Sequence, residues 1–183
     1  MLLIALGRGP IAQGRARAYI AGMYAFDIAA GSKSELYREL TTALDSLTAD
    51  EPDPIANMAN AAALLWEFLP DLNWAGFYRN LGGELVLGPF QGKVACIRIP
   101  FGKGVCGTAA AERETQLVED VNAFSGHIAC DSASRSELVV PIVHQGELIG
   151  VLDLDSPSLA RFDHGDAAGC EALVALLAPR LVA

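Results

Sequence analysis

The sequence lacks the features of membrane and nucleic-acid-binding proteins. It has no run of about 20 uninterrupted apolar residues, which excludes a membrane-spanning helix. Asp and Glu outnumber Lys and Arg by 22 to 13, the formal net charge is −9, and no basic stripe is present. Neither nucleic acid nor an anionic membrane surface is therefore expected as a partner. The apolar residues 1–7 follow no basic residue and end at Arg8, so no secretory signal is predicted and a cytoplasmic location is expected.

The four cysteines include no C-x-x-C pair, which argues against a thioredoxin-like oxidoreductase. Without a secretory signal they are expected to serve catalysis, redox sensing or metal binding rather than a disulfide framework. A Cys₃His zinc site would need widely spaced ligands, namely Cys96, Cys106, Cys130 and His127. Structural zinc sites usually have short ligand spacings, so no metal is expected, and a zinc-binding structural protein is kept as a minor alternative.

The length of 183 residues suits a single globular domain with a sizeable core. Residues 1–30 are rich in Gly and Ala and show no clear period, so they are interpreted as an N-terminal extension of uncertain order. The domain itself is expected to span residues 31–183. Met23 is a second candidate for the start of translation.

Periodicity and turn residues predict helices at both ends of this domain and short strands between them. Leucines at helical spacing follow the N-cap Ser32, Asp53-Pro54 opens a second helix, and Asp163 opens the last one. The predicted strands are 73–79, 84–87, 95–99, 115–118, 137–143 and 147–154, with a short helix over 104–113. This order predicts an α+β fold, a mostly antiparallel sheet flanked by N- and C-terminal helices.

The cysteines differ in their expected surroundings. Cys170 shares the last helix with apolar residues and is expected in the core. Cys106 follows a helix start near Lys103, an environment that favours a thiolate. Cys130 falls in a polar loop that does not protect it by burial. Cys96 falls on a predicted strand, where burial and a resolving role both stay open.

Three acidic residues are predicted to meet at the end of a hairpin. Asp153 and Asp155 are two positions apart on one strand, so their side chains share a face, and Glu137 begins the preceding strand. An antiparallel hairpin turning at Gln145-Gly146 places Glu137 beside them. Like charges placed together raise one another's pKa, an arrangement that suits a proton donor or a cationic ligand group. The alternative interpretation is a solvated strand end.

Trp74 and Tyr78 share one face of the first predicted strand. Such residues most often belong to a core. An indole wall would also suit a small ligand that carries a methyl or thioether group.

Several motifs together resemble the free methionine-(R)-sulfoxide reductases, enzymes built on a GAF domain. They are Asn-Trp-Ala-Gly-Phe-Tyr at 73–78, Leu-Gly-Pro-Phe-Gln-Gly at 87–92, and the segments 98–107, 126–131 and 150–156. The resemblance covers roughly residues 31–178 and implies a GAF-type catalytic domain. It also implies reduction of the R epimer of free methionine sulfoxide, with thioredoxin as external reductant and no bound cofactor.

The resemblance further implies roles for individual residues. In the redox chemistry it assigns the nucleophile to Cys130, the principal resolving thiol to Cys96 and a further redox role to Cys106. It also implies three ligand-binding acids, Glu137, Asp153 and Asp155. Trp74 and Tyr78 are implied as residues of a methyl-sulfinyl pocket. The expected reaction passes through a cysteine sulfenic acid and an intramolecular disulfide.

The main alternative function is a GAF module that senses a small molecule or a redox state without turnover, because a fold alone does not determine function. Such modules are usually joined to output domains, for which this chain has no room. The oligomeric state stays open, a homodimer included.

Overall fold

The computed structural model describes residues 26, 28, 31–126 and 132–182. In this part of the chain, six strands form one antiparallel sheet in the order β3-β2-β1-β6-β5-β4. The strands are β1 (Trp74–Asn80), β2 (Glu84–Gly92), β3 (Arg98–Pro100), β4 (Gln116–Val118), β5 (Ser136–His144) and β6 (Glu147–Ser156). The helices are α1 (Lys33–Thr48), α2 (Pro54–Phe68), α3 (Gly104–Glu112) and α4 (His164–Leu177), with short 3₁₀ turns at Val121–Ala123 and Ala178–Arg180. The predicted α+β class is confirmed.

The helix starts follow the local capping chemistry. Ser32 and Glu35 form the capping box that opens α1. The Asp53 carboxylate accepts hydrogen bonds from two backbone N–H groups, and Pro54 occupies the first position of α2. Asp163 caps α4 in the same way. All three predicted starts are confirmed because a cap depends on neighbours within one turn.

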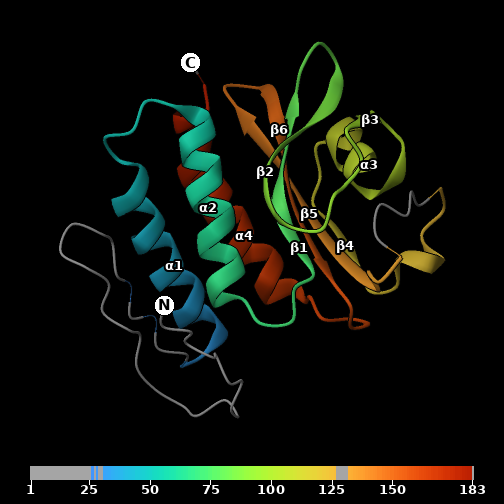
Figure 1. The fold of residues 1–183 in the computed structure, drawn as a ribbon, viewed down its shortest axis with the longest axis horizontal. Helices are drawn as coiled ribbons and strands as arrows, with labels where there is room; N and C mark the ends of the chain where they lie inside the picture. The colour runs from blue at the N-terminus through green and yellow to red at the C-terminus, as the bar shows by residue number, and fades with distance from the viewer. Residues whose placement is uncertain (1–25, 27, 29–30, 127–131, 183) are drawn as a thin grey trace, which may run out of the picture.

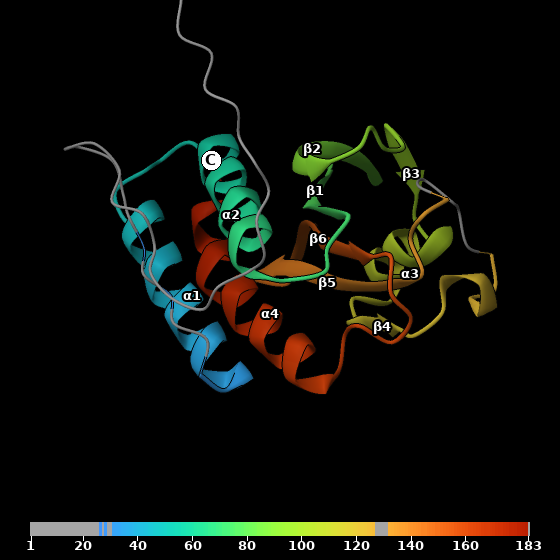
Figure 2. The same cartoon turned by 60° about the horizontal axis from the view of Figure 1, so that its bottom comes forward.

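Two apolar cores lie on opposite faces of the sheet. Helices α1, α2 and α4 gather on one face, and α3 lies on the other with β3 beside it (Figure 1; Figure 2). The helix-side core is built around residues such as Leu40, Phe77 and Leu173. The core under α3 includes Tyr78 and Val139. Because side chains alternate along a strand, each residue of β1, β5 and β6 is committed to one of these faces.

Strand β2 runs five residues past its predicted end at position 87. Gly88-Pro89 indicates a break in the sequence, but β2 continues to Gly92 through a bulge opposite Phe77 of β1. A bulge tolerates proline because no ladder hydrogen bond is required there. The extension places Phe90 opposite Gly76 of β1.

The third strand is shorter than predicted. Strand β3 starts at Arg98 and pairs with β2 over three residues, so Cys96 and Ile97 precede it. Ile97 is 70% exposed and lies outside β3, although the sequence predicted a strand over 95–99. The paired residues end at Val86 and Arg98, and one further backbone hydrogen bond, from Leu87 N–H to the carbonyl oxygen of Ile97 at 3.0 Å, continues toward the segment that precedes β3.

The structure describes little of the predicted N-terminal extension. Of the predicted extension 1–30, only Phe26 and Ile28 are described, and both pack against the helix-side core. Met23 lies outside the described residues, so the alternative start stays a prediction. No helix in the described part of the chain is long and apolar enough to cross a membrane.

Candidate active site

The register of three strands brings the predicted acids together on the α3 face of the sheet. Glu137 of β5 is paired with Asp155 of β6. Asp153 lies between Val139 of β5 and Gly76 of β1. Glu137 and Asp153 are buried, whereas Asp155 is partly exposed. The hairpin geometry expected from the sequence is found, and both acids are buried rather than solvated.

A thiol from α3 completes this arrangement. Cys106 Sγ donates a hydrogen bond to Glu137 Oε1 at 3.8 Å. One possible ligand atom from each of Cys106, Glu137 and Asp153 lies within 4.8 Å of the other two. We call these three residues the thiol–acid cluster. Its members come from α3, β5 and β6, so the packing of α3 on the sheet assembles it.

Burial determines the protonation of the thiol–acid cluster. It raises the pKa of Glu137 well above its usual value, and the charges of Asp153 and Asp155 raise it further. The pKa of Asp153 is raised by burial and then by Asp155. Because like charges in a buried site resist ionisation, the cluster retains protons on its carboxyl groups at pH values where exposed acids have lost theirs.

The prediction that Cys106 favours the thiolate form is wrong. Burial raises the pKa of Cys106 well above its usual value, and the neighbouring charges of Asp153 and Glu137 add to the shift. Lys103 is exposed and provides no side-chain cap to α3. The sequence argument counted only the local helix start, whereas desolvation and two acids on distant strands dominate.

A stack of three aromatic rings forms the wall beside the acids. The Trp74 ring stacks on Tyr78 with centroids 5.8 Å apart and on Phe90 at 5.2 Å. A Cβ atom on Gly76 would lie 2.7 Å from Trp74 Cη2, so glycine leaves the space that the indole occupies. The indole N–H donates to the carbonyl oxygen of Lys93 at 3.2 Å. Phe90 was not among the predicted site residues, because the predicted strand ended before it.

The sequence matches the GAF domain family over residues 46–181. Free methionine-R-sulfoxide reductase of Escherichia coli is 53% identical over 146 residues, which are 80% of this chain and 88% of that protein. The yeast enzyme of the same name, from Saccharomyces cerevisiae, is 46% identical over 154 residues, 80% of this chain and 86% of that protein. The X-ray structure of free methionine-R-sulfoxide reductase from Neisseria meningitidis in complex with its substrate has a TM-score of 0.84 at 50% identity, covering 87% of this chain and 96% of that chain. The chain belongs to the GAF-domain free methionine-R-sulfoxide reductase family. The family and fold expected from the motifs are confirmed.

The cysteines of this family member lie in different environments. Cys96 is half-buried against the core under α3 and is disulfide-bonded. Cys106 and Cys170 are free thiols. Cys170 is fully buried on α4, which confirms its predicted place in the core, and burial raises its pKa to about 12. Cys130 and His127 lie outside the described residues, so the role of Cys130 and the widely spaced zinc site stay untested.

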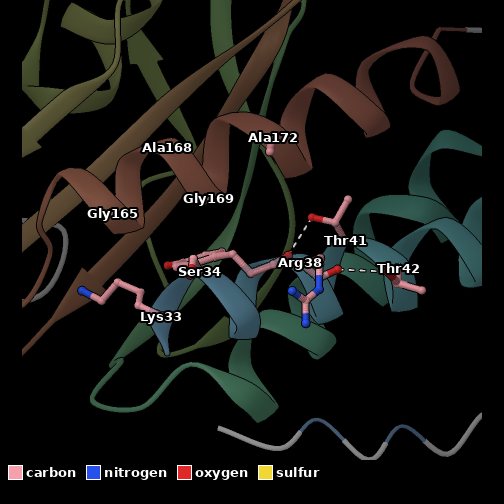
Figure 3. A pocket seen from close by; sticks show the side chains of 10 residues that line it. Lys33, Ser34, Arg38, Thr41, Thr42, Gly165, Ala168, Gly169 and Ala172 are labelled. Carbon is pink, nitrogen blue, oxygen red and sulfur yellow. Dashed lines mark hydrogen bonds between the residues drawn. The ribbon is translucent and has the colours of Figure 1, made fainter. Parts of the chain in front are cut away.

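A cavity of about 550 Å³ lies between α1 and α4, in the helical layer away from the thiol–acid cluster. Figure 3 shows Arg38 and Thr42 of α1 on one side of it and Ala168 and Ala172 of α4 on the other. Lys33, which also lines it, pairs with Asp163 and Asp166 at the start of α4. The Lys33 side chain is therefore already paired. None of the acids of the thiol–acid cluster and none of the rings of the Trp74 stack lines this cavity.

Proposed function

We propose that this protein reduces free methionine-(R)-sulfoxide to methionine with electrons from thioredoxin. The carrying observation is the thiol–acid cluster, buried on the sheet face that also holds the Trp74 ring stack. The acids of the cluster suit the cationic amino group of the substrate, and the ring stack suits its methyl-sulfinyl group. The names of the close relatives support the same activity.

The acids explain recognition of a free amino acid. Glu137, Asp153 and Asp155 project from adjacent strands onto one face. Asp153 Oδ1 is buried and has no hydrogen-bond partner among the described residues, so it can accept a hydrogen bond from the substrate ammonium group. A methionine sulfoxide inside a peptide lacks this charge, and its amide would leave the buried acids unpaired. Selection for the free amino acid follows.

The aromatic wall accounts for the other end of the substrate. Trp74, Tyr78 and Phe90 present faces and edges to an apolar methyl group and a polarisable sulfur. Burial and the charge of Asp153 raise the pKa of Tyr78, so its hydroxyl stays a neutral hydrogen-bond donor. The strand β1 therefore supplies the pocket for the methyl-sulfinyl group.

The proposed first step moves oxygen from methionine sulfur to cysteine sulfur. The Cys130 thiolate attacks the sulfoxide sulfur while a protonated carboxyl group, Glu137 or Asp153, gives its proton to the sulfoxide oxygen. Methionine sulfur is reduced by two electrons, Cys130 sulfur is oxidised by two to a sulfenic acid, and methionine leaves. The raised pKa values of both acids favour the protonated form that this step needs.

The proposed second step regenerates the enzyme. The Cys96 thiol attacks the sulfenic sulfur, which forms a disulfide and releases water, and thioredoxin then reduces the disulfide. Engagement of Cys96 in a disulfide supports this role. Cys106 is a neutral, buried thiol and hence a poor first nucleophile. We therefore assign it a secondary redox role, as a thiol that can substitute for Cys96 in the resolving step. The reaction uses one chain and fits a reducing compartment such as the cytoplasm.

The test is a thioredoxin-coupled assay that follows NADPH oxidation with the free R epimer, the free S epimer and a peptidyl sulfoxide. We expect turnover of the free R epimer alone and loss of activity in Cys130→Ser. Cys96→Ser should turn over once and then stall unless Cys106 substitutes as the resolving thiol. Cys170→Ala, a change in the opposite core, is the control and should retain activity. Binding of the R epimer without methionine formation would instead favour the sensor module.

A further inference from the structure

We propose that the thiol–acid cluster binds one Zn²⁺ ion when substrate is absent, so that zinc reversibly inhibits the enzyme. The cluster offers one sulfur and two carboxylate ligands from Cys106, Glu137 and Asp153, all buried. It shares only Cys106 with the widely spaced Cys₃His set considered from the sequence. Two strands and a helix hold these ligands, so the site needs no large rearrangement to form.

The spacing of the donors fits tetrahedral zinc. With Zn–S of about 2.3 Å and Zn–O of about 2.1 Å, tetrahedral angles separate sulfur and oxygen ligands by about 3.6 Å. Cys106 Sγ and Glu137 Oε1 lie 3.8 Å apart, and the three ligand atoms fall within 4.8 Å. The most widely separated pair would have to approach by about 1 Å, a movement that rotation of the carboxylate side chains can supply. Three protein ligands leave a fourth position for water.

A second observation points to a cation at this place. Asp153 is 5% exposed, and its Oδ1 atom has no hydrogen-bond partner in the part of the chain that the structure describes. A buried, unpaired carboxylate oxygen is costly unless a cation or a donor meets it. The sulfur of Cys106 favours Zn²⁺ over Mg²⁺ or Ca²⁺, which prefer oxygen ligands. Binding releases the Cys106 proton and any proton on the two carboxyl groups to solvent.

Zinc and substrate would then exclude each other. Glu137 and Asp153 are also the acids that we assign to the substrate ammonium group, and this competition rests on the proposed function. Metal binding itself does not rest on it. The two claims are therefore separable by experiment.

Metal binding is tested in a Cys96→Ser/Cys130→Ser background, which leaves Cys106 and Cys170 as the thiols of the chain. Titration of the metal-free protein with Zn²⁺ should show one ion bound, and Co²⁺ should produce a thiolate-to-metal charge-transfer absorption. Adding Cys106→Ser should abolish that absorption, whereas adding Cys170→Ala should retain it. Asp153→Asn and Glu137→Gln should each weaken Zn²⁺ binding about 10-fold or more.

Absence of stoichiometric uptake, or a charge-transfer band that survives Cys106→Ser, would overturn the metal site. Two acid variants are included so that misfolding of one, checked by circular dichroism, leaves the other to decide. In the same double-serine background, free methionine-(R)-sulfoxide should weaken Zn²⁺ binding in proportion to its own occupancy. Tight zinc binding that the substrate leaves unchanged would overturn the competition and the assignment of these acids to the ammonium group.

Discussion

The substitution Glu137→Gln should stabilise the free protein at neutral pH, although it removes a proposed substrate contact. Glu137 is 6% exposed and shares a buried space with Asp153 and Cys106. Burial, followed by the charges of Asp153 and Asp155, raises its pKa. Glutamine has the same shape and carries no charge, so it relieves this penalty while it keeps a hydrogen-bonding group.

The magnitude follows from the spacing of the two acids. If Glu137 and Asp153 were both ionised, their repulsion across a distance of no more than 4.8 Å would cost about 3 kcal/mol at an effective dielectric constant of 20. If Glu137 instead kept its proton, the penalty would have the same sign, because its raised pKa means that the unfolded chain gives up the proton at a lower pH than the folded protein does. Glutamine removes the penalty in either case.

The sign of the pH dependence follows from the raised pKa. Below the unfolded pKa both states of the wild-type protein hold the proton, and this contribution to stability is fully present. As pH rises above 4.5 the unfolded chain releases the proton first, so stability is lost until the pH passes the folded pKa. The advantage of Glu137→Gln should therefore be small at pH 4.5 and grow as the pH rises toward neutrality, to about 3 kcal/mol once the repulsion between the two acids is fully developed.

The assay is urea unfolding of both proteins between pH 4.5 and 8, with a chelator present to exclude metal binding. Glu147→Gln, at the exposed start of β6, is the matched control and should change the unfolding free energy by less than about 0.5 kcal/mol at every pH. An effect of Glu137→Gln that is the same at all pH values, or destabilising at pH 7, would refute the reasoning.

Three further substitutions test the packing. Gly169→Ala should lower the unfolding free energy by about 1–3 kcal/mol, because its Cβ would lie 2.2 Å from Tyr37 Cγ; an unchanged melting temperature would contradict the tight α1–α4 contact. Gly76→Ala should raise KM for free methionine-(R)-sulfoxide, because the new Cβ would lie 2.4 Å from Phe90 Cβ and 2.7 Å from Trp74 Cη2 and would displace these rings. A folded variant with the wild-type KM would show that the ring stack does not bind the substrate. Phe90→Leu should cost about 1 kcal/mol by removing the ring stacked on Trp74, and identical urea midpoints would show that this stack contributes nothing.

Local features of the fold could be predicted because their causes lie close together in the chain. The cap at Ser32 acts within one helical turn, and the β5–β6 hairpin is closed by a short turn at Gln145-Gly146. Alternation along those strands then placed Glu137, Asp153 and Asp155 on one face. The end of β2 was missed because Gly88-Pro89 has the composition of a break, and only pairing with β1 shows it to be a bulge.

The sequence by itself determined the family, the helix starts, the hairpin and the shared face of the three acids, all of which depend on motif identity or short-range periodicity. Only the tertiary structure decided that α3 covers this face, that Phe90 joins the aromatic wall, and that Cys106 is a neutral thiol rather than a thiolate. The physical reason is that these three outcomes depend on interactions between residues far apart in the sequence. Desolvation and charge coupling depend on distance in space, and Cys106 meets Glu137, 31 positions away, only after the sheet and α3 have packed.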